Sequence, residues 1–553
     1  MELLNHWKQS RPHGRGHRHR VGCAIVAYAL AGVPLLATAG TWQTLKNPPP
    51  LGEVIDPSGK DFGPGGAAGP LLLTDGSVLI QNAGAGEDGT ILKLTPDIHG
   101  SYVNGTWTRL ASKPFISSGG AQAVLADGRV ILEGGEFSNF GYDFLLTNQG
   151  AIYDPVSNTW TPVPPPLFFN DLFPPRAVFA PHPIGDSASV ILEDGTFMLA
   201  DKMSHQAARL DLKTLTWTET GTATKSDLND EEGWVLLRDG KVLTVDCYTD
   251  FTFGLIPSYP ANPTNSEIYD PATGDWSSAG STIHTLTDPV LAEIGPLLMR
   301  PDGNVFALGS SGDSSIYEPT SHRWVVGPTL PISPQGFQYT AQDAPGALLP
   351  DGNVLVAASG GASFEGGFSN PPVAFFEFDG RQFIAEPTIP NAAHDMSGSI
   401  SLLLLPTGQV LAVDGTNDVE IYTPDEKARG GDRGDEESHR PEWAPRIFWA
   451  PPVVRPGSSY RLEGLRLNGV SQGSFFGDEL QDATNYPLVR ITNLLTHHVF
   501  YSRTHDHSSM SVSFDRVSST HFDVPAVQER GLSRLEVVAN GVASEPVLVF
   551  VEK

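Results

Sequence analysis

"LLLTDGSVLI", residues 71–80, places a tight Asp75-Gly76 turn between two apolar runs. Asp-Gly between β-rich runs is the strongest short-range signal for a β-hairpin, because both turn residues tolerate positive φ. We therefore expect a hairpin here, with positive φ at both residues. The pattern recurs at intervals of 45 to 67 residues, and the further copies are "AVLADGRVIL" (Asp127), "VILEDGTFML" (Asp194), "VLLRDGKVLT" (Asp239), "LMRPDGNVFA" (Asp302), "LLPDGNVLVA" (Asp351) and "LLLPTGQVLA" (Thr407).

Two further elements follow most copies of the hairpin. The first is an apolar segment such as "AIYDP" at 151–155 or "EIYDP" at 267–271, and the second is an aromatic residue a few positions later. Each unit therefore predicts four strands, and about 50 residues of this kind repeated seven times predict a seven-bladed β-propeller of the kelch type. Because the aromatic residues recur in register, we interpret them as packing between blades rather than as a ligand-stacking set: Trp107, Trp160, Trp217, Trp276, Trp324 and Phe383.

The seventh unit lacks its last strand at the C-terminal side. After Tyr422 the chain enters the charged stretch "DEKARGGDRGDEESHR", whereas "GTWQTLKNPP", with Trp42, precedes the first unit. We expect this N-terminal strand to complete the last blade, because closing the ring removes the exposed sheet edges. The propeller is thus predicted over 40–424, with a linker at 425–440.

Residues 1–39 have the pattern of a targeting segment. A basic region precedes the apolar run "VGCAIVAYALAGVPLLATAG", which ends in the A-x-A sequence Ala37-Thr38-Ala39. This favours a cleaved signal peptide, with an uncleaved membrane anchor as the alternative because the run is close to the length of a membrane span. We therefore predict a secreted or extracytoplasmic protein, at the cell surface or in the periplasm.

From the charge and the cysteine content, neither nucleic-acid binding nor an intramolecular disulfide is expected. The formal net charge is −28, so nucleic acid is not expected as a partner, and a membrane is expected only if the N-terminal segment stays uncleaved. Of the two cysteines, Cys23 lies in the targeting segment, which leaves Cys247 without a partner for an intramolecular disulfide. We expect a monomer.

The long loops of a propeller gather on one face, opposite the Asp-Gly turns. Binding residues are commonly found on loops held by a rigid scaffold. The loops "DLNDEEG", "DCYTDFTFGLIPSYPANPTNS", "QGFQYTAQD" and "NAAHDMSGS" make this face acidic and aromatic. Solvated loops with turn-stabilising acids would show the same composition, but a central pocket lined by some of these residues is our working hypothesis. The ligand-binding candidates are Glu231, Tyr248, Asp250, Tyr339 and His394, with Glu232, Asp343 and Asp395 as further polar residues.

From residue 441 the repeat stops, and 441–553 consist of short alternating runs without a helix-length amphipathic segment. This predicts a β-sandwich of the immunoglobulin-like (E-set) class, in which "NGVSQGSFFGDELQDATNYP" is a long loop. His505 and His507 in "RTHDHSSM" would share one face of a strand and could grip a metal, with His394 or His521 as a third ligand. Alternatively, these histidines are polar residues that hydrogen-bond at a domain junction.

The whole layout resembles the galactose oxidase and glyoxal oxidase family, also in phrases such as "SGSISLLLLPTGQVLAVDG". The segments "NYPLVRITN" and "NDEEGWVLLRDGKVLTVD" look still closer to bacterial kelch-repeat proteins of unassigned function. The oxidase resemblance implies a copper ion with a tyrosyl radical, held by a Tyr-His pair, by a Tyr cross-linked to a Cys and by a histidine of the C-terminal domain. Ser397 and Gly398 stand where the Tyr-His pair is expected, and only His505 has a plausible counterpart.

These observations favour a non-catalytic binding protein that has kept the oxidase architecture. We expect it to bind a glycan, a surface polymer or a protein through the long-loop face, with no catalytic residues and no cofactor. The enzyme alternative is an extracellular copper-dependent oxidase with a rearranged ligand set, drawn from His505, His507 and His394, with Tyr339 or Tyr248. A structural surface protein whose sandwich mediates assembly is the third possibility.

Overall fold

The chain is an all-β protein. The structure, a computed structural model, describes residues 40–553 apart from 84–86, 139–142, 145, 170–179, 248–263, 288–292, 362–368, 426–439 and 478–480. Within these residues the only helix is the short 3-10 turn η1 (Ser397–Ser399), and no helix is long and apolar enough to cross a membrane. The predicted signal segment, the 425–440 linker and the loop with Tyr248 and Asp250 fall wholly or mostly outside the described residues.

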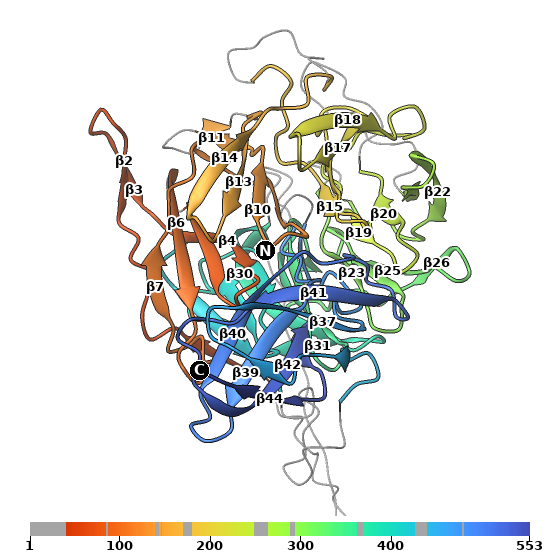
Figure 1. The fold of residues 1–553 in the computed structure, drawn as a ribbon. Coiled ribbons are helices and arrows are strands. Elements are labelled where there is room, and N and C mark those ends of the chain that lie inside the picture. Colours follow the sequence, from red (N-terminus) through yellow and green to blue (C-terminus); the bar gives the residue numbers. More distant parts are fainter. Residues whose placement is uncertain are drawn as a thin grey trace, which may run out of the picture. The chain divides into compact units, whose positions relative to one another are not determined.

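Seven antiparallel sheets form the blades of a β-propeller, six of them with four strands and that of blade 6 extended by two further strands (Figure 1). Blade 1 contains β4 (Ala67–Leu72), β5 (Val78–Ala83), β6 (Glu87–Thr95) and β7 (Thr106–Arg109). Blade 2 contains β9 (Ala121–Val124), β10 (Val130–Glu133), β13 (Gly150–Asp154) and β14 (Thr159–Val163). Blade 3 contains β15 (Ser189–Ile191), β16 (Phe197–Ala200), β17 (Ala207–Asp211) and β18 (Thr216–Thr220). Blade 4 contains β19 (Val235–Leu236), β20 (Val242–Val245), β21 (Asn265–Asp270) and β22 (Asp275–Ser281).

The remaining blades follow the same order. Blade 5 contains β23 (Leu297–Met299), β24 (Val305–Leu308), β25 (Ser314–Glu318) and β26 (Arg323–Val326). Blade 6 contains β28 (Pro345–Leu348), β29 (Val354–Gly360), β30 (Asn370–Phe378) and β31 (Phe383–Glu386), with β27 (Tyr339–Thr340) paired to β29. Blade 7 contains β32 (Ser401–Leu404), β33 (Val410–Val413), β34 (Val419–Thr423) and β1 (Thr41–Thr44). Short pairings lie outside the blades: β2 (Glu53–Ile55) with β3 (Asp61–Pro64), and β8 (Ser117–Ser118) with β11 (Phe137–Ser138) and β12 (Asp143–Phe144).

The ring is closed by pairing the two ends of the propeller sequence. Strand β1 pairs antiparallel with β34, opposing Trp42 to Tyr422, as the sequence predicts. The first strands of successive blades contact one another all round, including β32 against β4 across the closure. The repeating aromatic residues pack on the neighbouring strand of the same blade: Trp160 on Tyr153, Trp276 on Tyr269 and Trp324 on Tyr317, with ring centroids 5.0, 5.3 and 5.2 Å apart.

The Asp-Gly turns have a different geometry from the expected one. Gly76 has a φ of 74° and Gly128 a φ of 80°, but none of the turn aspartates is among the residues with positive φ. Instead, the Asp75 carboxylate accepts the backbone N–H of Ser77 at 3.0 Å, and the same contact recurs in the turns of blades 2 to 6. The prediction of positive φ at both turn residues is therefore wrong, because the aspartate acts as a local acceptor and only the glycine takes the left-handed conformation.

The C-terminal residues form two sets of strands around one apolar core. One set is β35 (Arg446–Trp449), β37 (Ser459–Leu465) and β41 (Val517–Asp523). The other is β39 (Leu488–Asn493), β42 (Gly531–Ala539), β43 (Val542–Ala543), β44 (Val547–Val551) and β36 (Val453–Val454). Strand β40 (Val499–His505) pairs with β39 through its first half and with β41 through its second half. Both sets supply the core: Leu462 and Phe522 from one, Val489, Leu535 and Val549 from the other.

The described residues of a C-terminal segment, 472–477 and 481–486, contact the first strands of several blades. Its strand β38 (Ser474–Phe476) pairs with β28, and its backbone and side chains bond to further blades. The Gln472 side chain accepts the N–H of Leu236 in blade 4 at 2.8 Å, and the Gln122 amide of blade 2 donates to Asp482 at 2.6 Å. We call 472–486 the axial segment. The sequence predicted only a long loop here.

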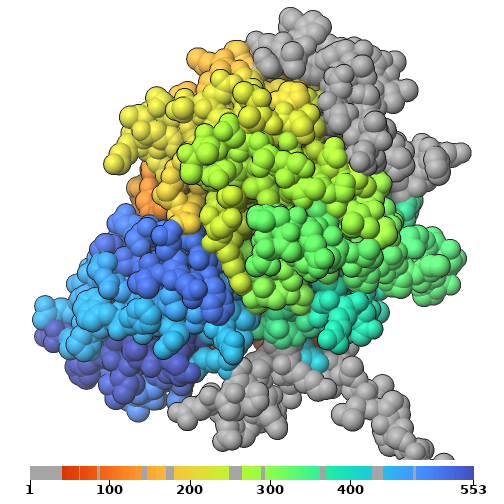
Figure 2. Space-filling model, turned by 90° about the vertical axis from the view of Figure 1, so that its right-hand side faces the viewer, coloured from red at the N-terminus to blue at the C-terminus, as the bar shows by residue number. Residues whose placement is uncertain are grey.

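The C-terminal strands dock on the Asp-Gly turns of the propeller. The N–H groups of Thr504, His507 and Met510 donate to the carbonyls of Thr74, Ala126 and Glu193, beside the turns of blades 1, 2 and 3. Figure 2 shows the blue C-terminal residues against the yellow residues of the blades. The turns of blades 1 to 3 are therefore covered on this face, and the loops that lead into the first strands lie at the opposite ends of those strands.

Candidate functional site

The loop before the first strand of blade 4, Lys225–Gly233, organises the acidic residues of the long-loop face. Glu231 has a φ of 57°, unusual for a side chain that is not glycine. This turn directs neighbouring acids to different places: Asp230 and Glu231 reach Lys202, whereas Asp227 and Glu232 reach Lys225. Two separate clusters result from one loop.

The first cluster contains three carboxylates from three successive blades. Glu231, Glu293 and Asp343 each lie just before the first strand of blades 4, 5 and 6, and their ligand oxygens all lie within 4.8 Å of one another. We call these residues the acidic trio. The Glu231 side chain is 13% exposed, so solvent reaches the trio. Burial, and then the charge of Asp343, hold the pKa of Glu293 well above its ordinary value.

One lysine partly compensates the trio. The Lys202 ammonium lies 2.8 Å from Asp230 and 2.6 Å from Glu231, and it also contacts Asp186 at 2.5 Å. Burial raises the pKa of Asp230 to about 7 although Lys202 opposes this shift. The acidic groups outnumber the single ammonium, and a cation that approaches the trio favours their ionised forms, because a nearby positive charge lowers the pKa of a carboxyl group.

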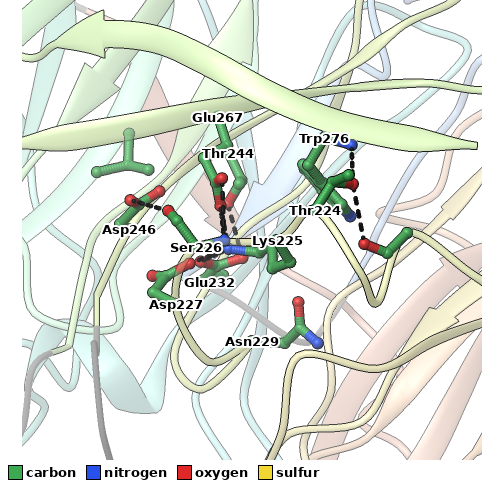
Figure 3. A network of polar contacts seen from close by, with 12 residues as sticks. Thr224, Lys225, Ser226, Asp227, Asn229, Glu232, Thr244, Asp246, Glu267 and Trp276 are labelled. Carbon is green, nitrogen blue, oxygen red and sulfur yellow. Dashed lines mark hydrogen bonds and ion pairs between the residues drawn. The ribbon is translucent and has the colours of Figure 1, made fainter.

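The second cluster is fully buried, between blades 3 and 4 (Figure 3). The Lys225 ammonium contacts Asp227, and lies 2.8 Å from both Glu232 and Glu267. Thr244 donates to Glu232 at 3.1 Å, and the Ser226 N–H donates to Glu267 at the same distance. The carboxylates raise the pKa of Lys225 above its ordinary value against the effect of burial, and burial raises the pKa of Glu232 to about 7. We call Lys225, Asp227, Glu232, Asp246 and Glu267 the buried cluster.

The structure brings one of the five ligand-binding candidates, Glu231, into the trio, together with Asp343, which the sequence offered as a further polar residue of this face. Tyr339 is 8% exposed and packs edge-on against Phe337 and Phe376, so its ring belongs to the core of blade 6. His394 is exposed in the loop before η1, where its N–H donates to the carbonyl of Asn391. Tyr248 and Asp250 lie outside the described residues.

The histidines of "RTHDH" lie at the docking face and not in the ring. His505 contacts Asp506 at 2.8 Å and Asp523 at 3.1 Å, and its ring stacks on His521. His507 is buried with its Nδ1 2.8 Å from Thr520, and burial lowers its pKa to about 3, which keeps it neutral. The prediction that His505 takes the position of a histidine reaching into the ring is therefore wrong, because His505 ends strand β40, opposite His521 of β41, and its side chain contacts Asp506 and Asp523.

The described residues do not bring the three histidines proposed as metal ligands into one group. Among the described residues, close groups of three potential metal ligands occur at the trio and in the buried cluster, and neither group contains His505, His507 or His394. The histidine stretch acts as the hydrogen-bonding domain junction that the sequence left as an alternative.

The residues present at the implied copper position do not fit that cofactor. The Ser397 hydroxyl donates to the carbonyl of Gln342, and a Cβ added at Gly398 would come within 3.0 Å of the Asp343 side chain. The thiol of Cys247 is buried and donates to the carbonyl of Glu231 at 2.9 Å. The place thus adjoins the acidic trio, and its described donors are carboxylates. Copper(II) sites of the implied kind need imidazole and phenolate ligands.

Sequence reasoning missed Glu293, Lys202 and most of the buried cluster. A signal was available, because Glu231, Glu293 and Asp343 all lie eight or nine residues before the aspartate or threonine position of the next turn. Aligning the seven repeats on their turns therefore places the three acids at one level of the ring.

The comparisons with known proteins recover only remote likenesses. No family model matches the sequence, and no curated protein matches it. Among solved structures, a fungal alcohol oxidase of the AA5 family in complex with copper has a TM-score of 0.45 and 14% identity, and covers 93% of this chain and 100% of its own. Virginiamycin B lyase from Staphylococcus aureus has a TM-score of 0.41 and 10% identity, over 69% of this chain and 99% of that one. YCF48 bound to D1 peptide has a TM-score of 0.39 and 11% identity, and the match covers 71% of this chain and 97% of that one. At these scores the matches say nothing about what this chain binds or catalyses.

Proposed function

We propose that this chain is an exported, non-catalytic propeller protein that binds a cationic ligand at the long-loop face. The ligand is a surface polymer, a glycan or a protein that displays amines. The observation that carries the proposal is the convergence of Glu231, Glu293 and Asp343 from three successive blades on the face that the C-terminal strands leave open. Carboxylates held at a partly dehydrated site bind ammonium groups more strongly than exposed ones do.

Two further features support a binding role. The net charge of −28 attracts cationic partners over a distance of about a Debye length. The axial segment bonds blades 2, 4, 6 and 7 to one another, so the loops around the trio rest on a rigid support. A rigid site loses little conformational entropy when it binds.

The proposal includes the layout expected from the sequence. Residues 1–39 are a signal segment, 40–424 a kelch-type propeller, 425–440 a linker and 441–553 an immunoglobulin-like sandwich. The two strand sets around one core in the C-terminal region support the last of these assignments. We propose a monomer without nucleic acid or a redox cofactor, and the copper oxidase is the less favoured function because the described donors around Ser397 are oxygens.

The test compares two probes that share one sugar backbone and differ only at the nitrogen substituent. Glucosamine oligomers carry a free amine on each sugar, whereas their N-acetylated counterparts have the same backbone and no charge. In biolayer interferometry we expect the protein to bind the amine-bearing oligomers, and binding to weaken as salt rises. Equal binding of the two probes would contradict a cationic ligand. So would a protein that binds neither the amine-bearing oligomers nor a polylysine surface.

A copper titration on the same protein separates the enzyme alternative. One tightly bound Cu²⁺ per chain, with nitrogen splitting in the EPR spectrum, would overturn the non-catalytic proposal. We expect weak copper binding without nitrogen splitting, because the accessible donors at the trio are carboxylates.

A further inference from the structure

We propose that the buried cluster holds a hard divalent cation between blades 3 and 4. Its ligands are the carboxylates of Asp227, Asp246 and Glu267, whose ligand oxygens all lie within 4.8 Å of one another. This site is distinct from the acidic trio and independent of the proposed cationic ligand.

The charges inside the buried cluster do not balance. Asp227, Glu232, Asp246 and Glu267 are at most 4% exposed, and the one ammonium among them is that of Lys225. Buried carboxylates without a counter-charge are strongly destabilising, so they bind either protons or a metal. A divalent cation would reduce the formal excess of negative charge from three to one.

Unpartnered oxygens point to where the ion lies. The Oδ2 atom of Asp227 and the Oδ1 atom of Asp246 are buried and accept no hydrogen bond from the described residues, and the Asp227 carboxyl also lies against that of Glu232. The residues themselves are 0% and 1% exposed. Buried polar groups are almost always satisfied, so two orphaned carboxylate oxygens in one cluster indicate a ligand. Figure 3 shows these two carboxylates on the same side of the Lys225 side chain.

The donor set selects the class of ion. All three ligands are carboxylates, and the nearby hydroxyls of Ser226 and Thr244 add further oxygens. Hard cations such as Ca²⁺, Mg²⁺ and Mn²⁺ prefer oxygen ligands, whereas Cu²⁺ and Zn²⁺ prefer nitrogen or sulfur. The Cys247 thiol donates to the carbonyls of Glu231 and Val245, which leaves it outside the ligand set.

The test counts the ion and measures what it does to stability. Protein unfolded in guanidinium with EDTA is refolded with Ca²⁺, Mg²⁺, Mn²⁺ or no metal, passed over a desalting column, and analysed by elemental mass spectrometry and thermal unfolding. We expect one ion per chain with at least one of the three metals, and a higher thermal midpoint than for the metal-free protein. Equal midpoints in all four samples without a stoichiometric ion would overturn the proposal, and would mean that protons neutralise the cluster.

Matched variants locate the ion. Asp246→Asn imitates the protonated acid, so a cluster neutralised by protons tolerates it, whereas a metal site loses affinity by about tenfold or more. Glu420→Gln is the control, because Glu420 is a buried acid at the equivalent position to Glu267 in blade 7, and among the described residues no lysine forms an ion pair with it. We expect the ion to be lost in Asp246→Asn and kept in Glu420→Gln.

The acidic trio is tested in parallel. Asp343→Asn should keep the buried ion, and loss of the ion in Asp343→Asn but not in Asp246→Asn would place it at the trio and overturn the inference. If Asp246→Asn does not fold, the ion count and the metal-dependent midpoint of the wild-type protein, together with Asp343→Asn, still decide the outcome.

Discussion

Replacing Trp42 with alanine tests the closure of the ring. The Trp42 ring lies 4.8 Å from Phe375 and 5.0 Å from Tyr422, and its indole N–H donates to the carbonyl of Pro387 at 2.7 Å. A fully buried tryptophan contributes about 3–5 kcal/mol relative to alanine. Trp42 is half-buried, so we expect Trp42→Ala to lower the free energy of unfolding by about 2–4 kcal/mol.

The loss should also detach strand β1. This strand is the free end of the propeller sequence, and Lys46, which follows it, offers a tryptic cleavage site. In the intact ring the N–H of Lys46 donates to Val103 and its amine contacts Asn104 at 2.6 Å, which protects the site. We therefore expect rapid trypsin cleavage after Lys46 in Trp42→Ala and slow cleavage in the wild-type protein.

The control is Trp217→Ala in blade 3. Trp217 packs on Phe197 and donates to Pro164 at 2.7 Å, but its strand β18 is held by the chain at both ends. Both variants should lose stability in urea unfolding followed by circular dichroism, and only Trp42→Ala should gain the new cleavage. If Trp42→Ala unfolds at the wild-type urea concentration and remains resistant to trypsin, the closure is not made by β1.

Three further substitutions probe the packing and the buried charges. Burial raises the pKa of Glu420 to about 8, so the folded chain holds a proton that the unfolded chain releases near pH 4.5. The stability of the fold should therefore fall as the pH rises from about 5 to 8. Glu420→Gln should flatten this part of the curve of thermal midpoint against pH. Lys225→Met leaves the buried carboxylates without their ammonium and should cost about 3–5 kcal/mol in urea unfolding, far more than Lys93→Met at the partly exposed contact with Asp75. Equal costs would contradict the burial argument. Gly128→Ala and Gly59→Ala both place a side chain at positive φ, but only at Gly128 does the new Cβ come within 2.7 Å of the Thr504 carbonyl. Calorimetry should therefore show a larger loss of stability for Gly128→Ala. Equal losses of stability would mean that the docking face adapts.

Much of the fold could be predicted from the sequence because short local sequence patterns mark each repeat. The Asp-Gly turns and the recurring aromatic residues mark each blade, and Trp42 marks the missing strand of the last one. The exact turn geometry was mispredicted because Asp75 bonds its own turn, which the dipeptide alone does not show.

The site could be predicted only in part, because its residues meet through the ring and not along the chain. Glu231 was found from the acidity of its loop, but Glu293 and Lys202 come from other blades, and nothing local marks them. The same holds for the axial segment, whose bonds to Leu236 and Gln122 span more than 200 residues of sequence. The histidine stretch has the spacing of a two-histidine metal site, yet its described contacts are hydrogen bonds at the docking face.

The most direct test of the binding account removes the charge of the trio alone. The variant Glu231→Gln, Glu293→Gln, Asp343→Asn is compared with a control that removes three exposed acids elsewhere, Glu53→Gln, Glu219→Gln, Asp275→Asn, so the two chains have equal net charge. Titration calorimetry with glucosamine oligomers should show about tenfold or greater weakening for the trio variant, as the loss of about 1.5–3 kcal/mol per charged hydrogen bond implies, and wild-type affinity for the control. Equal affinities of the two variants would show that net charge, and not the acidic trio, attracts the ligand.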